Sequence, residues 1–302
     1  MIVTIAQKKK FAADPAEYLS SFIRDYIATS VNNRFLDFPD EPIWEEPLIG
    51  IASGSDPLFQ EYKKIIGEFH LTPREIIDWY IDTTAHGNKN KISAVSVISF
   101  ALPATLKTRE SNRRENEICS VRWNRSRFEG QETVARLSRR LVALIEDMGH
   151  IAVAPELSRA WEIVNTPTGL SSKWSQRHAA YAAGLGTFSL SDGFITPKGI
   201  AIRVGSVVCD LDLPATPRKY ANHYANCIFL TKGTCKKCAD RCPAGAISEK
   251  GHDKSKCGAH LNKMREIAIA KGRIQEFIGK AYLGCGFCQT GVPCEDRIPL
   301  KS

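Results

Sequence analysis

The sequence contains no hydrophobic run long enough to cross a membrane. Its longest apolar stretch, ISAVSVISFALPATL, includes serines and is interrupted by Pro103, whereas a spanning helix needs about 20 consecutive apolar residues. The N-terminal MIVTIAQKKK places its few apolar residues before the basic ones, the opposite order to a secretory signal. We therefore expect a cytoplasmic protein without a membrane partner.

Internal repeats and low-complexity tracts are also absent. The 302 residues have a hydrophobic fraction of 43% and a charged fraction of 25%, ordinary values for a globular protein of one large or two smaller domains. In the first two thirds, segments with helical spacing alternate with β-branched apolar segments, which predicts an α/β domain. Helices are expected at 14–27, 55–69, 72–81, 131–149 and 172–184, and strands at 92–103 and 199–213.

Three of these helices begin with start signals. Asp14 and Asp56 are each followed by proline, so that a capping side chain precedes a proline in the first turn. Thr72, with Glu75 three residues later, predicts a capping box. The charged stretch 107–117 has no such pattern, and we expect a solvated loop there.

A boundary between two domains, 1–215 and 216–302, is predicted at PATPRKY, a stretch rich in proline and turn residues. The second domain has 16 Lys and Arg against 7 Asp and Glu, a net charge of +9, while the first has 25 against 26, a net charge of −1. The whole positive excess therefore lies in the C-terminal part. It can offset the negative charge of metal clusters, or attract an acidic electron donor or a nucleic acid.

Eight of the ten cysteines also lie in this C-terminal part. TCKKCADRCPAGAIS, at 234–248, spaces three of them C-x2-C-x3-C before a proline, as bacterial ferredoxins do. Two 4Fe–4S clusters need eight thiolates, one for each iron, and the cysteine before the proline serves the other cluster. The pattern predicts two crossed ligand sets, Cys227, Cys235, Cys238 and Cys294 for one cluster and Cys242, Cys257, Cys285 and Cys288 for the other.

Other uses of these cysteines stay open. A bacterial ferredoxin has a cysteine three residues before Cys235, where this chain has Lys232. Cys227 therefore reaches in across a longer loop, or that cluster has three irons or a different ligand. CGFC could belong to a structural zinc site. The spacing C-x2-C-x3-C is the reverse of the C-x3-C-x2-C spacing of radical-SAM enzymes. Disulfides are not expected in a chain without a secretory signal. Cys119 and Cys209 lie in apolar, strand-like contexts and are expected in the core.

Three segments together resemble the superfamily of epoxyqueuosine reductases and reductive dehalogenases. They are RHAAYAAGLGTFSLSDGFITPKGIAIRVGSVVCDLDL, CKKCADRCPAGAI and YLGCGFCQTGVPCEDRIP. The resemblance implies an N-terminal α/β domain of degenerate nitroreductase-like fold and an α+β, ferredoxin-like C-terminal domain with two 4Fe–4S clusters. It also implies base-off cobalamin held between them, and a low-potential electron donor of the ferredoxin or flavodoxin type.

The resemblance also implies positions that contact the corrin. The segment AGLG would lie along the ring, because glycine lets backbone approach closely, and the segment after it would contact the corrin side chains; the same glycines could instead form a helix end and a turn. These expected cofactor contacts are Ala183, Gly184, Leu185, Gly186, Ser189, Ser191 and Lys198.

The proton donor is where the chain departs from its relatives. Epoxyqueuosine reductases carry an acid upstream of AGLG, but no Asp or Glu occurs between Asn165 and Gly184. Respiratory dehalogenases use a Tyr as proton donor and carry a twin-arginine export signal, which this sequence lacks. The candidate proton donors here are Tyr181, His178 and Asp192. His178 and Arg177 could each donate a proton or hold an anion. Core packing is the alternative role for Tyr181.

Three functions are consistent with these patterns. The first is a cobalamin-dependent iron–sulfur reductase that acts on an unidentified small molecule. The second is an epoxyqueuosine reductase that acts on tRNA, although the missing acid counts against it. The third is an electron-transfer protein that binds no corrinoid. Binding of cobalamin and of tRNA would separate them.

Overall fold

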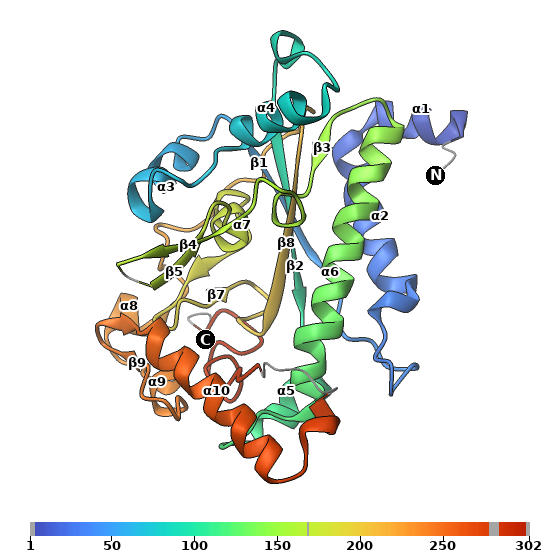
Figure 1. The fold of residues 1–302 in the computed structure, drawn as a ribbon. Helices are drawn as coiled ribbons and strands as arrows, with labels where there is room; N and C mark the ends of the chain where they lie inside the picture. Colours follow the sequence, from blue (N-terminus) through green and yellow to red (C-terminus); the bar gives the residue numbers. More distant parts are fainter. Residues whose placement is uncertain (1–3, 168, 278–283, 300–302) are drawn as a thin grey trace.

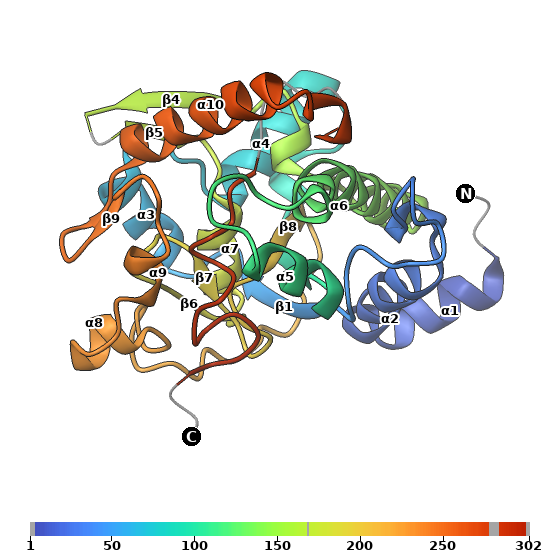
Figure 2. The ribbon, with the colours of Figure 1, turned by 90° about the horizontal axis from the view of Figure 1, so that it is seen from below.

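The protein is described by a computed structural model that covers residues 4–167, 169–277 and 284–299. Figures 1 and 2 show the chain from two directions. No helix in these ranges is both long and apolar enough to cross a membrane. The expected mixture of helices and strands is confirmed.

A four-stranded antiparallel sheet forms the centre of the N-terminal part. Its strands are β1 (Leu48–Ser53), β2 (Ser96–Pro103), β8 (Ile202–Cys209) and β3 (Ala152–Val153), in the order β1-β2-β8-β3. Every residue of β2 is buried, because helices cover both faces of the sheet. The strands predicted at 92–103 and 199–213 therefore exist, with shorter bounds.

Three helices lie on one side of the sheet (Figure 1). They are α1 (Ile5–Ala13), α2 (Pro15–Thr29) and α6 (Val121–Asp147). Two of them are next to its face, and α1 packs on α2. Leu137, Leu141 and Ile145 of α6 pack in a core that Phe100 and Val207 of the sheet share. The helix expected at 131–149 thus exists but begins earlier, at Val121, where the Ser120 side chain accepts a hydrogen bond from the Trp123 backbone N–H.

Three further helices pack on the opposite face. They are α3 (Leu58–Ile66), α4 (Pro73–Thr84) and α7 (Gln176–Ala182). Trp174, which precedes α7, is 2% exposed and stacks on Phe59 of α3 with ring centroids 6.1 Å apart. Two short hairpins extend this layer, β4 (Ile163–Thr166) with β5 (Gly169–Ser172), and β6 (Thr187–Phe188) with β7 (Phe194–Ile195).

The predicted start signals are present in the structure. Asp14 caps α2 by accepting from the Glu17 backbone, and Thr72 forms the capping box of α4 with Glu75. The third signal is shifted by one residue: Pro57, not Asp56, is the N-cap of α3, although the Asp56 carboxylate accepts from the Leu58 backbone N–H at 3.0 Å.

The prediction of a solvated loop at 107–117 was wrong. Most of this stretch forms α5 (Leu106–Arg113), in which Thr108, Arg109 and Asn112 are buried. Asn112 donates to the backbone carbonyl oxygen of Cys285 at 3.1 Å. The polar residues are covered because they bind the last cysteine-containing loop, which is distant in sequence.

The C-terminal part contains four short elements and one helix of 17 residues (Figure 2). They are α8 (Ile228–Lys232), α9 (Lys237–Asp240), β9 (Ile247–Ser248), β10 (Gly251–His252) and α10 (Lys254–Ala270). The segment 214–220, predicted as a boundary, is tied to the N-terminal part: the Thr216 backbone N–H donates to Ile51 at 2.8 Å, and Arg218 pairs with Asp56. The division into two domains, and their nitroreductase-like and ferredoxin-like character, stay predictions.

Candidate functional site

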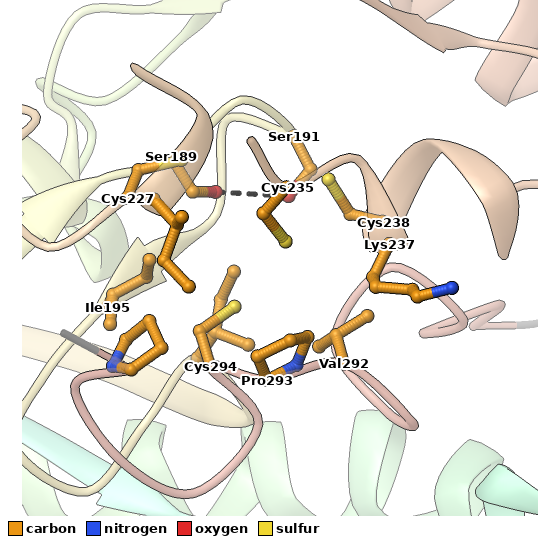
Figure 3. A pocket seen from close by; sticks show the side chains of 13 residues that line it. Ser189, Ser191, Ile195, Cys227, Cys235, Lys237, Cys238, Val292, Pro293 and Cys294 are labelled. Atoms are coloured by element: carbon orange, nitrogen blue, oxygen red, sulfur yellow. Dashed lines mark hydrogen bonds between the residues drawn. The ribbon is translucent and has the colours of Figure 1, made fainter. Parts of the chain in front are cut away.

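Four cysteines from three segments of the chain line one small cavity (Figure 3). They are Cys227, Cys235, Cys238 and Cys294. Cys227 is the N-cap residue of α8, and Cys238 lies in α9. In Figure 3 the sulfurs of Cys235 and Cys294 point toward the middle of the cavity. The structure therefore brings together the set that the crossed pattern assigned to one cluster, while their role as ligands stays a prediction.

The surroundings of this cavity are apolar. Ile195, Ile200 and Val292 are buried beside the four cysteines. Burial, and then the nearby thiols of Cys227 and Cys235, raises the pKa of the Cys238 thiol to about 11. Thiols so placed favour a cluster or metal over free thiolates, because bound iron would offset the negative charges.

The second predicted set also gathers in space. Burial raises the pKa of the Cys288 thiol above its usual range, and nearby Cys285 raises it further. Cys257 and Cys242 act on both of these thiols in the same direction. Such mutual effects require the four groups to be neighbours. Cys119 is buried in the core, as expected, but in the segment before α6 rather than in a strand.

Within the described ranges, no three His, Cys, Asp or Glu side chains are gathered closely enough to hold a single metal ion. A mononuclear zinc site needs its thiolates about 2.3 Å from one centre. A 4Fe–4S cluster distributes its thiolates over four irons, one on each. Four sulfurs around a shared cavity suit the cluster better than the single ion.

A much larger cavity, of about 790 Å³, opens beside α7. This volume lies in the usual range for small-molecule sites. All three candidate proton donors line it, Tyr181, His178 and Asp192. Arg177 lines it too, and its guanidinium donates to the backbone carbonyl oxygen of Asp192. The sequence candidates for catalysis therefore share one cavity.

The three candidates differ in protonation. Burial, and then His70 and Arg177, lowers the pKa of His178 to about 3, so its ring is neutral near pH 7. Burial favours a raised pKa for Asp192, but the hydrogen bond from His252 and other nearby positive charges hold it below its usual value. Asp192 is therefore an anion.

Tyr181 has an available hydroxyl. Among the residues that the structure describes, none makes a hydrogen bond to it, whereas the neighbouring Tyr62 hydroxyl donates to the His178 backbone carbonyl at 3.0 Å. Since this phenol O–H lines the large cavity and has no partner among the described residues, it is the group of the three that is free to donate to a bound molecule.

His252 connects the large cavity to the second cysteine set. Its Nδ1 lies 3.3 Å from Asp192 Oδ2. Hydrogen bonds with Asp192 and then with Cys257 raise the pKa of His252 to about 9. The imidazolium therefore lies between an acid of the cavity and a predicted cluster ligand.

The predicted corrin contacts lie elsewhere. Ala183 and Leu185 are buried, and a side chain on Gly184 would approach the backbone carbonyl oxygen of Pro217 to 3.0 Å. Ser189 and Ser191 line the small cysteine cavity, where their hydroxyl oxygens are 3.1 Å apart (Figure 3). Lys198 faces Glu46 across 3.7 Å, and Gly186 packs on Ile195. None of these seven residues lines the large cavity, and their contact with a corrin stays a prediction.

Sequence reasoning missed two charged residues near the site. Arg203 lies in β8 and lines a small cavity together with Arg127 of α6. An arginine within the apolar strand segment GIAIRVGSVV was a usable signal, because charged residues are seldom buried without a partner. His252 gave no signal, because its neighbours Asp192 and Cys257 come from different segments.

Curated proteins with similar sequences were found. No model of a known protein family matches the chain. The epoxyqueuosine reductases of Bacillus cereus and Bacillus anthracis are each 27% identical to it over 209 residues, which cover 66% of this chain and 47% of theirs. The chain thus spans about half the length of these curated relatives. The match confirms the resemblance that the motifs predicted.

Solved structures give a looser match. A selenomethionine-labelled epoxyqueuosine reductase has a TM-score of 0.46 and 16% identity, covering 95% of this chain and 66% of that one. An epoxyqueuosine reductase with a tRNA-Tyr stem loop has a TM-score of 0.47 and 15% identity, with the same coverage. A reductive dehalogenase has a TM-score of 0.39 and 21% identity, covering 55% of this chain and 23% of that one.

Proposed function

We propose that this chain is an iron–sulfur oxidoreductase of the epoxyqueuosine reductase type. One observation carries the proposal: Cys294 lines the same cavity as Cys227, Cys235 and Cys238, as the crossed ferredoxin pattern requires. The sequence match to epoxyqueuosine reductases supports the same class of reaction. A low-potential ferredoxin or flavodoxin would supply the electrons.

The residues present fit two 4Fe–4S clusters. Cys227, Cys235, Cys238 and Cys294 would hold one, and Cys242, Cys257, Cys285 and Cys288 the other. The Ala246 backbone N–H donates to the Cys242 sulfur at 3.4 Å, a contact that raises the potential of a thiolate-bound cluster. When bound, the clusters would supply one-electron transfer from the donor toward the large cavity.

The large cavity would hold the substrate. In this proposal Tyr181 supplies the proton that a reduced carbon–heteroatom bond requires. Asp192 and Arg177 position polar groups of the substrate. Neutral His178, whose Nδ1 lies 2.7 Å from the Ser175 hydroxyl, is a hydrogen-bond partner. The aromatic side chains of the wall, Tyr62 and Phe188 among them, exclude water.

Epoxyqueuosine in tRNA is the substrate to test first, because the relatives are epoxyqueuosine reductases. The absence of an acid between Asn165 and Gly184 counted against this substrate. In this proposal Tyr181, which lines the same cavity, takes the place of that acid as the proton donor. The net charge of +9 after residue 215 would attract the RNA backbone.

Cobalamin is the cofactor that the resemblance implies, and it would supply a low-potential cobalt centre. The residues expected to contact it do not line the large cavity. The glycines of AGLG are already packed against other backbone. The present arrangement does not fit a corrin along AGLG, so no step is derived through one.

The proposal is tested on anaerobically purified full-length protein. We expect about eight irons per chain and cluster signals in the EPR spectrum after dithionite reduction. Incubation with reductant and tRNA containing epoxyqueuosine should then yield queuosine on nucleoside analysis. Protein without iron after reconstitution would overturn the proposal. If the protein holds clusters but does not convert this tRNA, the assignment of epoxyqueuosine as the substrate is wrong.

Adding cob(II)alamin to the same sample tests the cofactor. A stoichiometric base-off cobalt signal would establish corrinoid binding and require AGLG to move from its present packing. Cluster signals without bound cobalt would leave two functions, a corrinoid-free reductase or an electron carrier. Turnover of the tRNA would identify the reductase, and no turnover the electron carrier.

A further inference from the structure

The last cysteine motif departs from the first in its spacing. Five residues, QTGVP, separate Cys288 from Cys294, whereas three separate Cys238 from Cys242. The residue after the final cysteine also differs, since the first motif continues with proline, as ferredoxins do, and the last with Glu295. A longer loop has more conformations to lose, so the position of Cys294 depends on what binds the loop.

The Glu295 side chain turns inward and holds this loop. It is buried, and its carboxylate accepts from the Gly291 backbone N–H at 2.6 Å. Gly291 has a φ of +69°, in the left-handed region that glycine adopts without strain. The Glu295 backbone N–H also donates to the Val292 carbonyl oxygen at 3.0 Å. Two hydrogen bonds of Glu295 therefore close the loop just before Cys294.

Two arginines of α5 bind the same carboxylate. Arg113 Nε donates to both oxygens, at 2.9 and 2.8 Å, and Arg109 Nε lies 3.6 Å from Oε1. The side chain of Arg109 is 8% exposed and that of Glu295 is 4% exposed, so this contact is shielded from water. Arg109 also lies 3.3 Å from Glu45, so it keeps a partner when Glu295 is changed. The carboxylate thus fastens the cysteine loop to α5 through charge-assisted contacts.

The backbone around Glu295 is held as well. The Ile200 N–H donates to the Cys294 carbonyl oxygen at 2.8 Å, and the Ala201 N–H donates to that of Glu295 at 3.3 Å. A side chain on Gly199 would approach the Glu295 carbonyl oxygen to 2.2 Å. The loop therefore lies directly against the chain that leads into β8, and Cys294 is held both by its own carbonyl and by its neighbour's side chain.

We propose that Glu295 is a positioning residue that keeps the Cys294 thiol at the small cysteine cavity. The other three thiols there belong to Cys227, Cys235 and Cys238, and none of these comes from the last motif. This inference rests on the proposed function, because it takes Cys294 as a cluster ligand. If the loop shifts, one iron would lose its thiolate while the other three keep theirs.

The experiment measures iron content and the EPR spectrum of the anaerobically purified full-length protein in its oxidised state. Glu295→Gln keeps the shape of the side chain but removes the charge that Arg109 and Arg113 bind. We expect about one iron fewer per chain than in the wild type, and the EPR signal of a three-iron cluster. Asp296→Asn is the matched control. It removes the same charge one residue later, from a carboxylate that pairs with the exposed Arg297 at 2.8 Å, and should keep the iron content and spectrum of the wild type.

A double-mutant cycle shows whether Glu295 acts through Cys294. Cys294→Ala alone removes the ligand, so adding Glu295→Gln to it should change neither the iron content nor the spectrum any further. A further loss of iron in the double variant would show that Glu295 acts on another cysteine, and would overturn the proposal. Arg113→Met serves if Glu295→Gln fails to fold. It removes the partner that is 37% exposed and should cause the same change to a smaller extent.

A purely structural role for Glu295 predicts a lower unfolding temperature with the full iron content. That result overturns the positioning role and leaves the clusters in place, and so does an Asp296 variant that loses as much iron as the Glu295 variant. A wild type that holds no iron after reconstitution overturns the proposed function, and the positioning role with it. The iron content of the wild type therefore distinguishes the two failures.

Discussion

Arg241 donates a hydrogen bond from Nε to the backbone carbonyl oxygen of Thr290, at 3.0 Å. Its two terminal nitrogens donate to the carbonyl oxygens of Arg113, Asn112 and Glu115. Arg241 lies between two cysteines of the first motif, and Thr290 lies between two cysteines of the last. One side chain therefore joins both cysteine segments to the end of α5.

We predict that Arg241→Met loosens both clusters. The substitution removes a donor from four carbonyl oxygens, of which that of Asn112 still accepts from the Glu115 backbone N–H. Each unsatisfied, partly buried group costs about 1–3 kcal/mol. Iron should be released to a chelator several-fold faster than from the wild type, measured anaerobically as the absorbance of the iron–chelator complex. Lys250→Met, exposed at the β9–β10 turn, should release iron at the wild-type rate. Equal rates for both variants would show that Arg241 does not hold the segments together.

Cys227 is the cysteine that departs from the ferredoxin spacing. If it completes the cluster with Cys235, Cys238 and Cys294, then Cys227→Ala should retain one intact 4Fe–4S cluster and about four of eight irons per chain. Iron analysis and EPR of the reduced protein measure this. Cys209→Ala, a buried cysteine whose sulfur lies 3.8 Å from the Ser96 carbonyl oxygen, should keep the full iron content. Full iron content in the Cys227 variant would remove it from the ligand set.

The local signals in the sequence predicted local structure well. Caps such as Asp14 and the Thr72–Glu75 box act between neighbours, so the sequence around them contains the whole interaction. The cysteine motif predicted which sulfurs share a cavity, because the crossed pattern encodes a contact across the chain. The candidate residues Tyr181 and Asp192 also proved to share a cavity.

The failures involve partners that are distant in sequence. Arg113 looked solvated in a charged stretch, but its Nε donates to the buried Glu295 carboxylate at 2.8 Å. Glu295 belongs to the last cysteine loop, so the sequence around 107–117 does not include the acid that binds Arg113. The packing of AGLG on Ile195 and Pro217 was also beyond local reasoning, because only the fold determines where those residues lie. Contact of the segment with a corrin stays a prediction.

His70 should make stability depend on pH. It is 1% exposed, and burial, and then the nearby Lys63 charge, lowers its pKa to about 4 from 6.5. The unfolded chain therefore binds more protons between these two values, so the free energy of unfolding falls as pH drops below about 6.5 and is retained above it. At pH 5.5 the loss from this group is about 1 kcal/mol.

The test compares thermal unfolding at pH 7.5 and 5.5. His70→Phe preserves the stacking on Trp174, at a centroid distance of 6.1 Å, but cannot take up a proton. The variant should lose about 2–4 °C less than the wild type between these pH values. Acid damage to the clusters is common to both proteins and cancels in the comparison. An equal loss in both would show that His70 is protonated alike in the folded and unfolded chains.

Tyr181 is predicted to supply the proton in the reaction. Tyr181→Phe should lower kcat on epoxyqueuosine-containing tRNA by about 10²–10⁴-fold, the usual contribution of a general acid, with little change in KM. Single-turnover kinetics measure the step directly. Tyr224→Phe is the control, because Tyr224 lines the same cavity but is 40% exposed. If the Tyr181 variant turns over at the wild-type rate, the proton comes from another group, and core packing explains the residue.

Gly186 decides between two explanations of the AGLG segment. A side chain there would approach the Ile195 backbone carbonyl oxygen to 2.3 Å, and this carbonyl also accepts from Asn226 at 2.9 Å. Gly186→Ala should therefore force β6 from β7 and cost about 1–3 kcal/mol by overpacking, seen as a lower unfolding temperature without cobalamin. Gly258→Ala, where no atom lies within 4 Å of the added carbon, should unfold like the wild type or at a higher temperature. A Gly186 variant with wild-type stability that fails to bind cobalamin would show that the glycine serves the corrin, since packing alone predicts instability whether or not the cofactor is added.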